Sequence, residues 1–315
     1  MNAQKISPLV AVIATGGTIA SKRGADGAST PSLRGEDLLA LVPQVNARLQ
    51  PIDLMSKDSA SLTLADMQRV SDIVRQQLDD PAIAGVVVLH GTDAMEETAL
   101  LVHLQHATDK PVVFTGAQFT ADHPHADGPA NLALAIETAM DQDNADRGVL
   151  VSFGGRLLPA WGVYKRSTDE PDAFRSARSI GHVESPRLST PVAGVRVDIV
   201  AIYPGCDATH IRASLDAGTD GIVLAALGSG NANPGIIEAV RRCTDTGVPV
   251  IVSSRVPDGR LVASYGGGGG GHDLAAAGAV HAHTLRPSQA RILLAALIAA
   301  RSPAERISQA FSDCR

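Results

Sequence analysis

The sequence contains few aromatic residues. Phe, Tyr and Trp together make up 3% of its 315 residues, whereas hydrophobic residues reach 44% and charged residues 19%. This composition is that of an ordinary globular protein, and its core has to be built from Val, Leu, Ile and Ala. A chain of this length suits one large domain or two smaller ones.

Cysteine is also scarce, and the three cysteines are widely scattered. Cys206, Cys243 and Cys314 cannot form a disulfide framework, and none has the spacing of a metal-binding motif. His123 and His125 flank a proline, but no third ligand follows at a suitable spacing. We interpret them as surface histidines and expect no metal.

Long apolar runs and a positive net charge are missing as well. No apolar stretch is long enough to cross a bilayer, and the N-terminal segment lacks the basic region and cleavage site of a signal peptide. The formal net charge is −6, which argues against a nucleic-acid partner. We therefore expect a soluble, cytoplasmic protein that binds neither nucleic acid nor membrane.

The most informative stretch is GVVVLHGTDAMEET, residues 85–98. Residues 86–89 are apolar and predict a strand buried on both faces, and a helical pattern follows. Asp93 with Glu96 three residues later is typical of a capped helix N-terminus. Thr92 and Asp93 therefore stand at the carboxyl end of a strand, where open α/β sheets bind ligands.

A second strand followed by a glycine turn lies near the N-terminus. Residues 9–14 (LVAVIA) are apolar, and Gly16, Gly17 and Thr18 come soon after. The segment is neither GxGxxG nor a P-loop, so a simple tight turn is one interpretation. The repeated order of strand, glycine turn and threonine favours a functional one. Residues 21–35 are polar and aperiodic, which is typical of a mobile lid loop.

Strand and helix patterns alternate through both halves of the chain, which predicts parallel sheets covered on both faces. Thr63 and Asp66 are typical of a helix cap. Residues 175–194 lose periodicity. We therefore predict an N-terminal catalytic α/β domain over 1–186, a linker over 187–194 and a C-terminal α/β domain over 195–315. The run Gly266–Gly271 is either a slack linker or a loop with unusual dihedral angles near a ligand or a neighbouring subunit.

The polar residues at the predicted strand ends suggest nucleophilic chemistry. A threonine hydroxyl needs a base to take its proton, and a lysine oriented by a carboxylate can serve as that base. Lys165 is the only lysine after Lys110; by itself it would be interpreted as a surface lysine. Together, Thr18 or Thr92, Lys165 and Asp93 resemble a Ser–His–Asp arrangement.

Rival nucleophiles lack a motif, because the chain has no Gly-x-Ser-x-Gly elbow and no reactive-cysteine signature. Backbone N–H groups of the Gly16–Gly17 turn and of the Gln118 turn could form an oxyanion hole.

The segments ATGGTIAS (14–21) and HGTDAMEET (90–98) resemble the two signatures of the bacterial L-asparaginases, the asparaginase/glutaminase threonine amidohydrolases. The similarity continues in DSASLT (58–63), TGAQ (115–118), ADGPANL (126–132), SSRVPDG (253–259) and LRPSQARILL (285–294). It covers nearly the whole chain. It implies a larger N-terminal domain with a flavodoxin-like, mostly parallel sheet and a smaller C-terminal α/β domain.

The resemblance also implies roles for individual residues. Thr18 matches the nucleophile that becomes acylated, and Thr92, Asp93 and Lys165 match the proton-handling group. The positions that match substrate-binding residues are Ser59, Asp58, Asp93, Gly91, Ala117, Thr30 and Asn231. Among these, Asn231 matches a contact supplied by a neighbouring subunit, and family members are usually homodimers or homotetramers.

Three positions depart from the family pattern. The lid of well-known members carries a tyrosine, but residues 21–35 contain none, and Thr30 is the nearest hydroxyl. Ser264-Tyr265-Gly266 lacks the carboxylate with which some relatives bind the substrate's α-amino group. Phe119 stands where many relatives have Arg. These departures bear on affinity and on acceptance of glutamine.

The sequence thus predicts hydrolysis of L-asparagine to L-aspartate and ammonia through a threonine acyl-enzyme, without metal or organic cofactor. An amidase that favours L-glutamine is one alternative, because a single methylene is worth only ~1–3 kcal/mol in discrimination. An inactive relative that senses an amino acid is another. A subunit of a tRNA-dependent amidotransferase would need an additional recognition domain.

Overall fold

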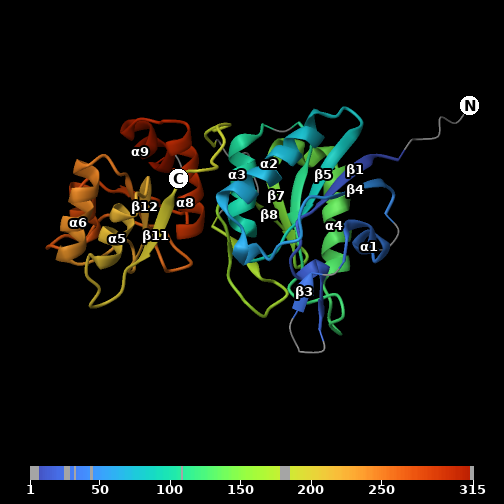
Figure 1. The fold of residues 1–315 in the computed structure, drawn as a ribbon, viewed down its shortest axis with the longest axis horizontal. Coiled ribbons are helices and arrows are strands. Elements are labelled where there is room, and N and C mark those ends of the chain that lie inside the picture. The colour runs from blue at the N-terminus through green and yellow to red at the C-terminus, as the bar shows by residue number, and fades with distance from the viewer. Residues whose placement is uncertain are drawn as a thin grey trace, which may run out of the picture. The chain divides into compact units, whose positions relative to one another are not determined.

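The computed structural model describes residues 7–24, 29–31, 33–42, 45–107, 109–177 and 185–312. The chain divides into two compact units, Met1–Glu184 and Ser185–Arg315 (Figure 1). The predicted linker over 187–194 stays a prediction. No helix in the described ranges is long and apolar enough to cross a bilayer.

The first unit is organised around a mostly parallel sheet. In the described part of the unit this sheet has six strands in the order β4-β1-β5-β6-β7-β8, and only β8 runs antiparallel to its neighbour. Without β8 the order is the 2-1-3-4-5 order of flavodoxin-like folds. The predicted flavodoxin-like sheet is therefore confirmed. The strands are β1 (Leu9–Ala14), β4 (Arg48–Asp53), β5 (Ile83–Leu89), β6 (Val112–Thr115), β7 (Val149–Phe153) and β8 (Arg156–Pro159).

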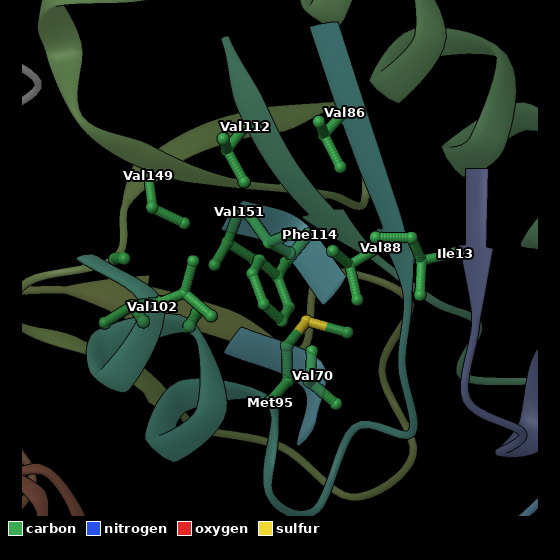
Figure 2. Packing of buried hydrophobic residues seen from close by; sticks show 14 of the residues in the cluster. Ile13, Val70, Val86, Val88, Met95, Val102, Val112, Phe114, Val149 and Val151 are labelled. Carbon is green, nitrogen blue, oxygen red and sulfur yellow. The ribbon is translucent and has the colours of Figure 1, made fainter. Parts of the chain in front are cut away.

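Helices cover both faces of this sheet, because alternate strand residues point to opposite sides. Val86 and Val88 of β5 pack with α2 (Leu64–Asp79) and α3 (Met95–Gln105) around Phe114, as Figure 2 shows. Val87 and Leu89 of β5 pack on the other face with α1 (Gly35–Ala40) and α4 (Gly128–Met140). The central strands are thus buried on both sides, as their uninterrupted apolar runs predict.

Several short elements were not predicted. The lid segment was interpreted as a loop, but β2 (Ser21–Arg23) and β3 (Ser29–Pro31) pair antiparallel within it. That interpretation was wrong because strands of three residues are too short to show a periodicity. Likewise, the sequence loses its periodicity from residue 175 onward, but β10 (Phe174–Ser176) extends to residue 176. This strand pairs antiparallel with β9 (Val163–Lys165).

The second unit has a smaller sheet in which all described strands are parallel, in the order β11-β12-β13-β14. This confirms the predicted smaller α/β domain. Its strands are β11 (Val197–Ala201), β12 (Gly221–Ala226), β13 (Val250–Ser254) and β14 (Val280–His281). Its helices are α5 (Thr209–Asp216), α6 (Pro234–Asp245), α7 (Gly271–Ala276), α8 (Pro287–Ala299) and α9 (Ala304–Ser312).

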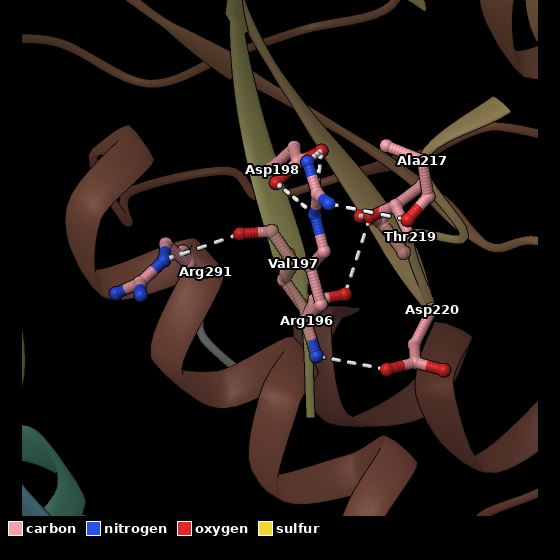
Figure 3. Close-up of polar contacts among 8 residues, drawn as sticks. Arg196, Val197, Asp198, Ala217, Thr219, Asp220 and Arg291 are labelled. Atoms are coloured by element: carbon pink, nitrogen blue, oxygen red, sulfur yellow. Dashed lines mark hydrogen bonds and ion pairs between the residues drawn. The ribbon is translucent and has the colours of Figure 1, made fainter. Parts of the chain in front are cut away.

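Arg196 fixes the start of the edge strand β11 (Figure 3). Its backbone N–H donates to Asp220, and its guanidinium reaches Asp198 and the carbonyl of Ala217. From α8, Arg291 donates to the Val197 carbonyl at 3.2 Å. These contacts occupy backbone groups near the exposed edge of the sheet.

The glycine run forms a defined loop rather than slack chain. One carboxylate oxygen of Asp273, in α7, accepts the backbone N–H groups of Gly268, Gly269 and Gly270 at 2.8 to 3.0 Å. Gly267 and Gly268 have φ values of 93° and 97°, which side chains rarely adopt. The run therefore forms a loop with unusual dihedral angles, and its position near a ligand or a neighbouring subunit stays a prediction.

Candidate functional site

The first unit has a topological switch point between β1 and β5. Strand β1 lies between β4 and β5, so the connections leaving β1 and β5 diverge at their carboxyl ends. Thr15 joins these ends, because its N–H and its hydroxyl both donate to the Leu89 carbonyl, at 3.1 and 2.9 Å. Ligands of open α/β sheets bind at such a position. The two threonine turns leave the sheet there.

The two threonine turns touch through their glycines. A Cβ atom added to Gly17 would lie 2.5 Å from the Cα of Gly91 and 2.7 Å from its nitrogen. Only a glycine at position 17 allows the two backbones to approach so closely. Because Thr18 follows Gly17 and Thr92 follows Gly91, this contact brings the two turns side by side.

A third turn, around Ser59, packs against the same glycine. Ser59 is buried, and a Cβ atom on Gly91 would lie 2.5 Å from its hydroxyl oxygen. That oxygen accepts the backbone N–H of Asp93 at 3.2 Å. Asp58 is exposed and accepts the N–H of Ala60, at the start of a short 3₁₀ turn. The three turns therefore meet at Gly91.

An ion pair ties the Ser59 turn to α2. Lys57 Nζ donates to both carboxylate oxygens of Asp66, at 2.8 and 2.9 Å. Asp66 also accepts from Thr63, so the predicted cap of α2 is confirmed. Hydrogen bonds from Lys57 and from the Thr63 backbone lower the pKa of Asp66 to about 2. The carboxylate is therefore ionised near pH 7.

Lys165 lies between Thr92 and Asp93. Its Nζ donates to Thr92 Oγ1 at 2.8 Å and to Asp93 Oδ1 at 2.7 Å. The exposed fraction is 6% for Thr92 and 20% for the Lys165 side chain, whereas that of the Asp93 side chain is 55%. A protected hydroxyl thus touches an amine that is oriented by a carboxylate. This is the spatial arrangement expected of a base and its orienting group.

The predicted helix cap at Asp93 was wrong. Helix α3 begins at Met95 after Ala94, and no side chain caps it. Asp93 instead contacts the Lys165 amine, and Glu96 accepts the backbone N–H of Lys165 at 2.5 Å. The carboxylates still lie near the positive end of the helix dipole. Their hydrogen bonds, however, reach a residue distant in sequence.

His90 fixes the backbone between β5 and Thr92. Its ring is fully buried, and Nδ1 lies 2.7 Å from the Gly91 carbonyl oxygen. Because a carbonyl only accepts, Nδ1 carries the proton and donates. Burial lowers the pKa of His90 to about 4, although the hydrogen bond to Gly91 acts in the opposite direction. The ring is therefore neutral near pH 7 and holds the turn rather than exchanging protons.

The turn after β6 is held by the carboxylate of Asp127. Asp127 accepts the backbone N–H groups of Gln118 and Phe119 at 3.0 Å. Asn131 donates to Asp127 and to the Gly116 carbonyl, both at 3.0 Å. The N–H groups of the Gln118 turn are predicted oxyanion donors. Among them the Gln118 N–H is already engaged by Asp127 and is not a free donor.

The other predicted oxyanion donors are the backbone N–H groups of Gly16 and Gly17. The N–H groups of Gly16 and Gly17 donate to no backbone acceptor in the described ranges. Both glycines are buried and have positive φ, 104° and 85°. Backbone N–H groups of such a glycine turn can approach a bound anion closely. The Gly16–Gly17 turn thus remains the candidate oxyanion hole.

The remaining predicted residues lie as follows. Thr18 opens a 3₁₀ turn directly after Gly17 and is partly exposed. Ala117 is buried in the core cluster that also contains the residues after Thr18. Thr30 pairs with Lys22 in β3, and its side chain lies outside the described part. Asn231 belongs to the second unit, where its Oδ1 accepts the N–H of Gly271 at 3.2 Å.

Three residues that hold the site were missed from the sequence, Glu96, Asp127 and Asn131. Glu96 was interpreted as a cap, and the segment ADGPANL, which contains the other two, was noted only as part of a family pattern. No cluster of three potential metal ligands occurs among the described residues. His123 and His125 are exposed.

Fold and site together define a class of protein. A doubly covered parallel sheet presents two threonine turns at its switch point, with an amine–carboxylate pair beside one of the hydroxyls. These groups suit nucleophilic catalysis by a hydroxyl, which is a hydrolase chemistry.

Comparison with known families gives the particular family. A model described as "Asparaginase, N-terminal" matches residues 9–190, and one described as "Glutaminase/Asparaginase C-terminal domain" matches residues 196–311. The chain therefore belongs to the asparaginase family of amidohydrolases, and the resemblance noted in the sequence is confirmed.

Relatives match over nearly the whole chain. A "Probable L-asparaginase" of Deinococcus radiodurans is 33% identical over 327 residues, covering 97% of this chain and 98% of the relative. "L-asparaginase 2" of Escherichia coli is 31% identical, covering 97% of this chain and 93% of the relative. A "Glutaminase-asparaginase" of Acinetobacter glutaminasificans is 29% identical, covering 96% and 98%.

Proposed function

We propose that this protein is an L-asparaginase, which hydrolyses L-asparagine to L-aspartate and ammonia through an acyl-enzyme on Thr18. One observation carries the proposal: Lys165 Nζ lies 2.8 Å from Thr92 Oγ1 and 2.7 Å from Asp93 Oδ1. The names of the relatives from D. radiodurans and E. coli support the choice of substrate.

The reaction has two halves. The Thr18 hydroxyl oxygen bonds to the side-chain amide carbon of asparagine, and its proton passes to the departing nitrogen, which leaves as ammonia. A water molecule then attacks the resulting ester, while Thr92 and Lys165 carry its proton to the Thr18 oxygen as the ester bond breaks. Aspartate leaves and Thr18 is restored. Asp93 keeps the Lys165 amine within reach of Thr92 throughout.

Other groups orient the substrate. The Gly16–Gly17 N–H groups would stabilise negative charge on the attacked carbonyl oxygen. Ser59 can donate its hydroxyl proton to the substrate α-carboxylate, because its oxygen already accepts from the Asp93 N–H. The exposed carboxylate of Asp93 suits the α-ammonium group. The family resemblance assigns Asp58, Ala117 and Thr30 to the substrate as well.

Removal of single hydroxyls tests the assignment. Thr18→Val keeps the shape of the side chain without its oxygen, and Thr18→Ser keeps the oxygen. We expect Thr18→Val and Thr92→Val to lose at least about 10³-fold in kcat for ammonia release, as loss of a nucleophile or its partner does. Thr18→Ser should retain measurable turnover. Full activity in folded Thr18→Val would overturn the assignment.

L-Glutamine is the second candidate substrate, because a relative is named glutaminase-asparaginase. Ammonia release from both amino acids over a concentration series measures the ratio of the two kcat/KM values. We expect asparagine to be preferred by about 10-fold or more, within the ~1–3 kcal/mol that one methylene supplies. Binding of asparagine without turnover would instead identify an amino-acid sensor.

We also propose that the protein works as a homodimer or homotetramer in which Asn231 reaches the site of a neighbouring subunit. Sedimentation of the purified protein gives the subunit number. Asn231→Ala should raise KM for asparagine, and a monomer with full activity would contradict the proposal. A cytoplasmic location is proposed from the sequence and is tested by cell fractionation.

A further inference from the structure

Glu96 contacts the same lysine as Asp93, at its opposite end. Asp93 Oδ1 accepts from the Lys165 amine, whereas Glu96 accepts the backbone N–H of Lys165 at 2.5 Å. The two carboxylates come from one short stretch at the start of α3. The partner residue lies 69 positions further along the chain from Glu96.

The Lys165 N–H is free for this contact because of the strand geometry. Strand β9 pairs antiparallel with β10, and the next N–H, that of Arg166, donates to the Ala173 carbonyl on the β10 side at 2.7 Å. Successive N–H groups of a strand point to opposite sides. The Lys165 N–H therefore faces away from β10, toward Glu96.

Val163 and Phe174 anchor the ribbon that carries Lys165 in the core, whereas Lys165 itself lies at the partly exposed end of its strand. In the described structure, β9 and β10 form a two-stranded sheet with three residues in each strand. Such a short ladder fixes few backbone groups, so the end of the strand at Lys165 depends on contacts from outside the ribbon. A contact to α3 therefore matters for the position of Lys165, because α3 begins just after Thr92 and Asp93.

We propose that Glu96 is a positioning residue, which holds the backbone of Lys165 so that its amine stays between Thr92 and Asp93. The proposal rests on the proposed function for its kinetic consequence. A displacement of about 1 Å in a catalytic group costs up to ~100-fold in rate. Substrate affinity should change little, because the Ser59 turn is anchored separately by the pair of Lys57 and Asp66.

Three substitutions separate the hydrogen bond from the charge. Glu96→Gln keeps an oxygen acceptor and removes the charge, Glu96→Asp keeps the charge and withdraws the acceptor by one methylene, and Glu96→Ala removes both. Glu97→Gln removes a neighbouring charge from the same helical turn and is the matched control. Each variant is characterised by kcat, KM and thermal unfolding with asparagine as substrate.

We expect Glu96→Ala and Glu96→Asp to lose about 10- to 100-fold in kcat, with KM within about twofold of the wild-type value. Glu96→Gln and Glu97→Gln should stay within about threefold of wild-type kcat. Equal losses in the Gln and Ala variants would make charge the cause and overturn the proposal. Unchanged kcat in the Asp variant, or a loss confined to KM, would overturn it too.

A second measurement does not depend on turnover. Hydrogen–deuterium exchange at the Lys165 amide should be at least about 10-fold faster in Glu96→Ala and Glu96→Asp than in wild type, and unchanged in the Gln variants. Unchanged exchange refutes the contact itself. If wild type releases no ammonia from either amino acid, the proposed function fails, and the exchange data still decide whether Glu96 holds Lys165.

Discussion

Replacement of Gly17 by alanine tests whether the contact between the threonine turns sets their spacing. The new Cβ would lie 2.5 Å from the Gly91 Cα, whereas ordinary contact begins at 3.4 Å. The turns would have to separate by about 0.9 Å, a displacement that costs ~100-fold in rate when it moves reacting groups. With φ of 85° and ψ of −175°, Gly17 lies in a region that almost only glycine occupies, which adds about 1–3 kcal/mol of destabilisation. We therefore expect a folded, less stable variant with kcat lowered about 100-fold.

Gly205→Ala is a matched control, because Gly205 has the same φ of 85° and nothing lies within 4 Å of an added Cβ. It should lose only the stability that the positive φ costs and keep its kcat. Gly91→Ala should raise KM more than it lowers kcat, because its Cβ would lie 2.5 Å from the Ser59 hydroxyl and 2.7 Å from the Ser59 Cβ and would displace this substrate-binding turn. Ammonia release and thermal unfolding measure both effects. Equal kcat for Gly17→Ala and wild type would refute the reasoning.

The remaining predictions concern groups that support the site. Asp66, whose pKa is lowered from 3.8 to about 2, contributes stability that is present above about pH 4 and lost as the pH falls toward 2. Allowing for its half-exposed lysine partner, Asp66→Asn should cost about 1–2 kcal/mol in urea unfolding at pH 6 and almost nothing at pH 2. Asp127→Ala should lower kcat/KM about 10-fold, because two backbone N–H groups lose a charged acceptor worth ~1.5–3 kcal/mol each. An unchanged kcat/KM would show that the turn containing Ala117 keeps its conformation without Asp127. Phe114→Ala should lower the free energy of unfolding by about 3–5 kcal/mol in urea titrations, because Phe114 is fully buried.

The main strands and the helix cap of α2 could be predicted because their signals are local. Residues 9–14 and 86–89 are apolar without interruption, which strands buried on both faces require. Thr63 and Asp66 cap a helix three residues apart, as their spacing predicts. The order of strands and turns then placed Thr92 and Asp93 at the carboxyl edge of the sheet.

The partners of those residues could not be predicted, because they depend on contacts between distant segments. A carboxylate three residues after Asp93 can accept a local N–H or the N–H of Lys165, and the two bonds are similar in energy. The sequence pattern favours the local one, but the structure has the distant one. Strands as short as β9 likewise show no periodicity, so no sequence pattern indicates which elements hold Lys165 in place.

The contacts at Gly91 explain why the informative motifs are glycine–threonine turns rather than clusters of side chains. Backbone atoms of the Gly17 and Gly91 turns touch directly, and the Ser59 hydroxyl packs on the same glycine. Backbone contacts between turns leave no rotamer free to change, so they fix the separation of Thr18 and Thr92 more tightly than side-chain packing would. The lysine, by contrast, reaches Thr92 on a long flexible side chain. It therefore needs carboxylates at both ends, which Asp93 and Glu96 supply.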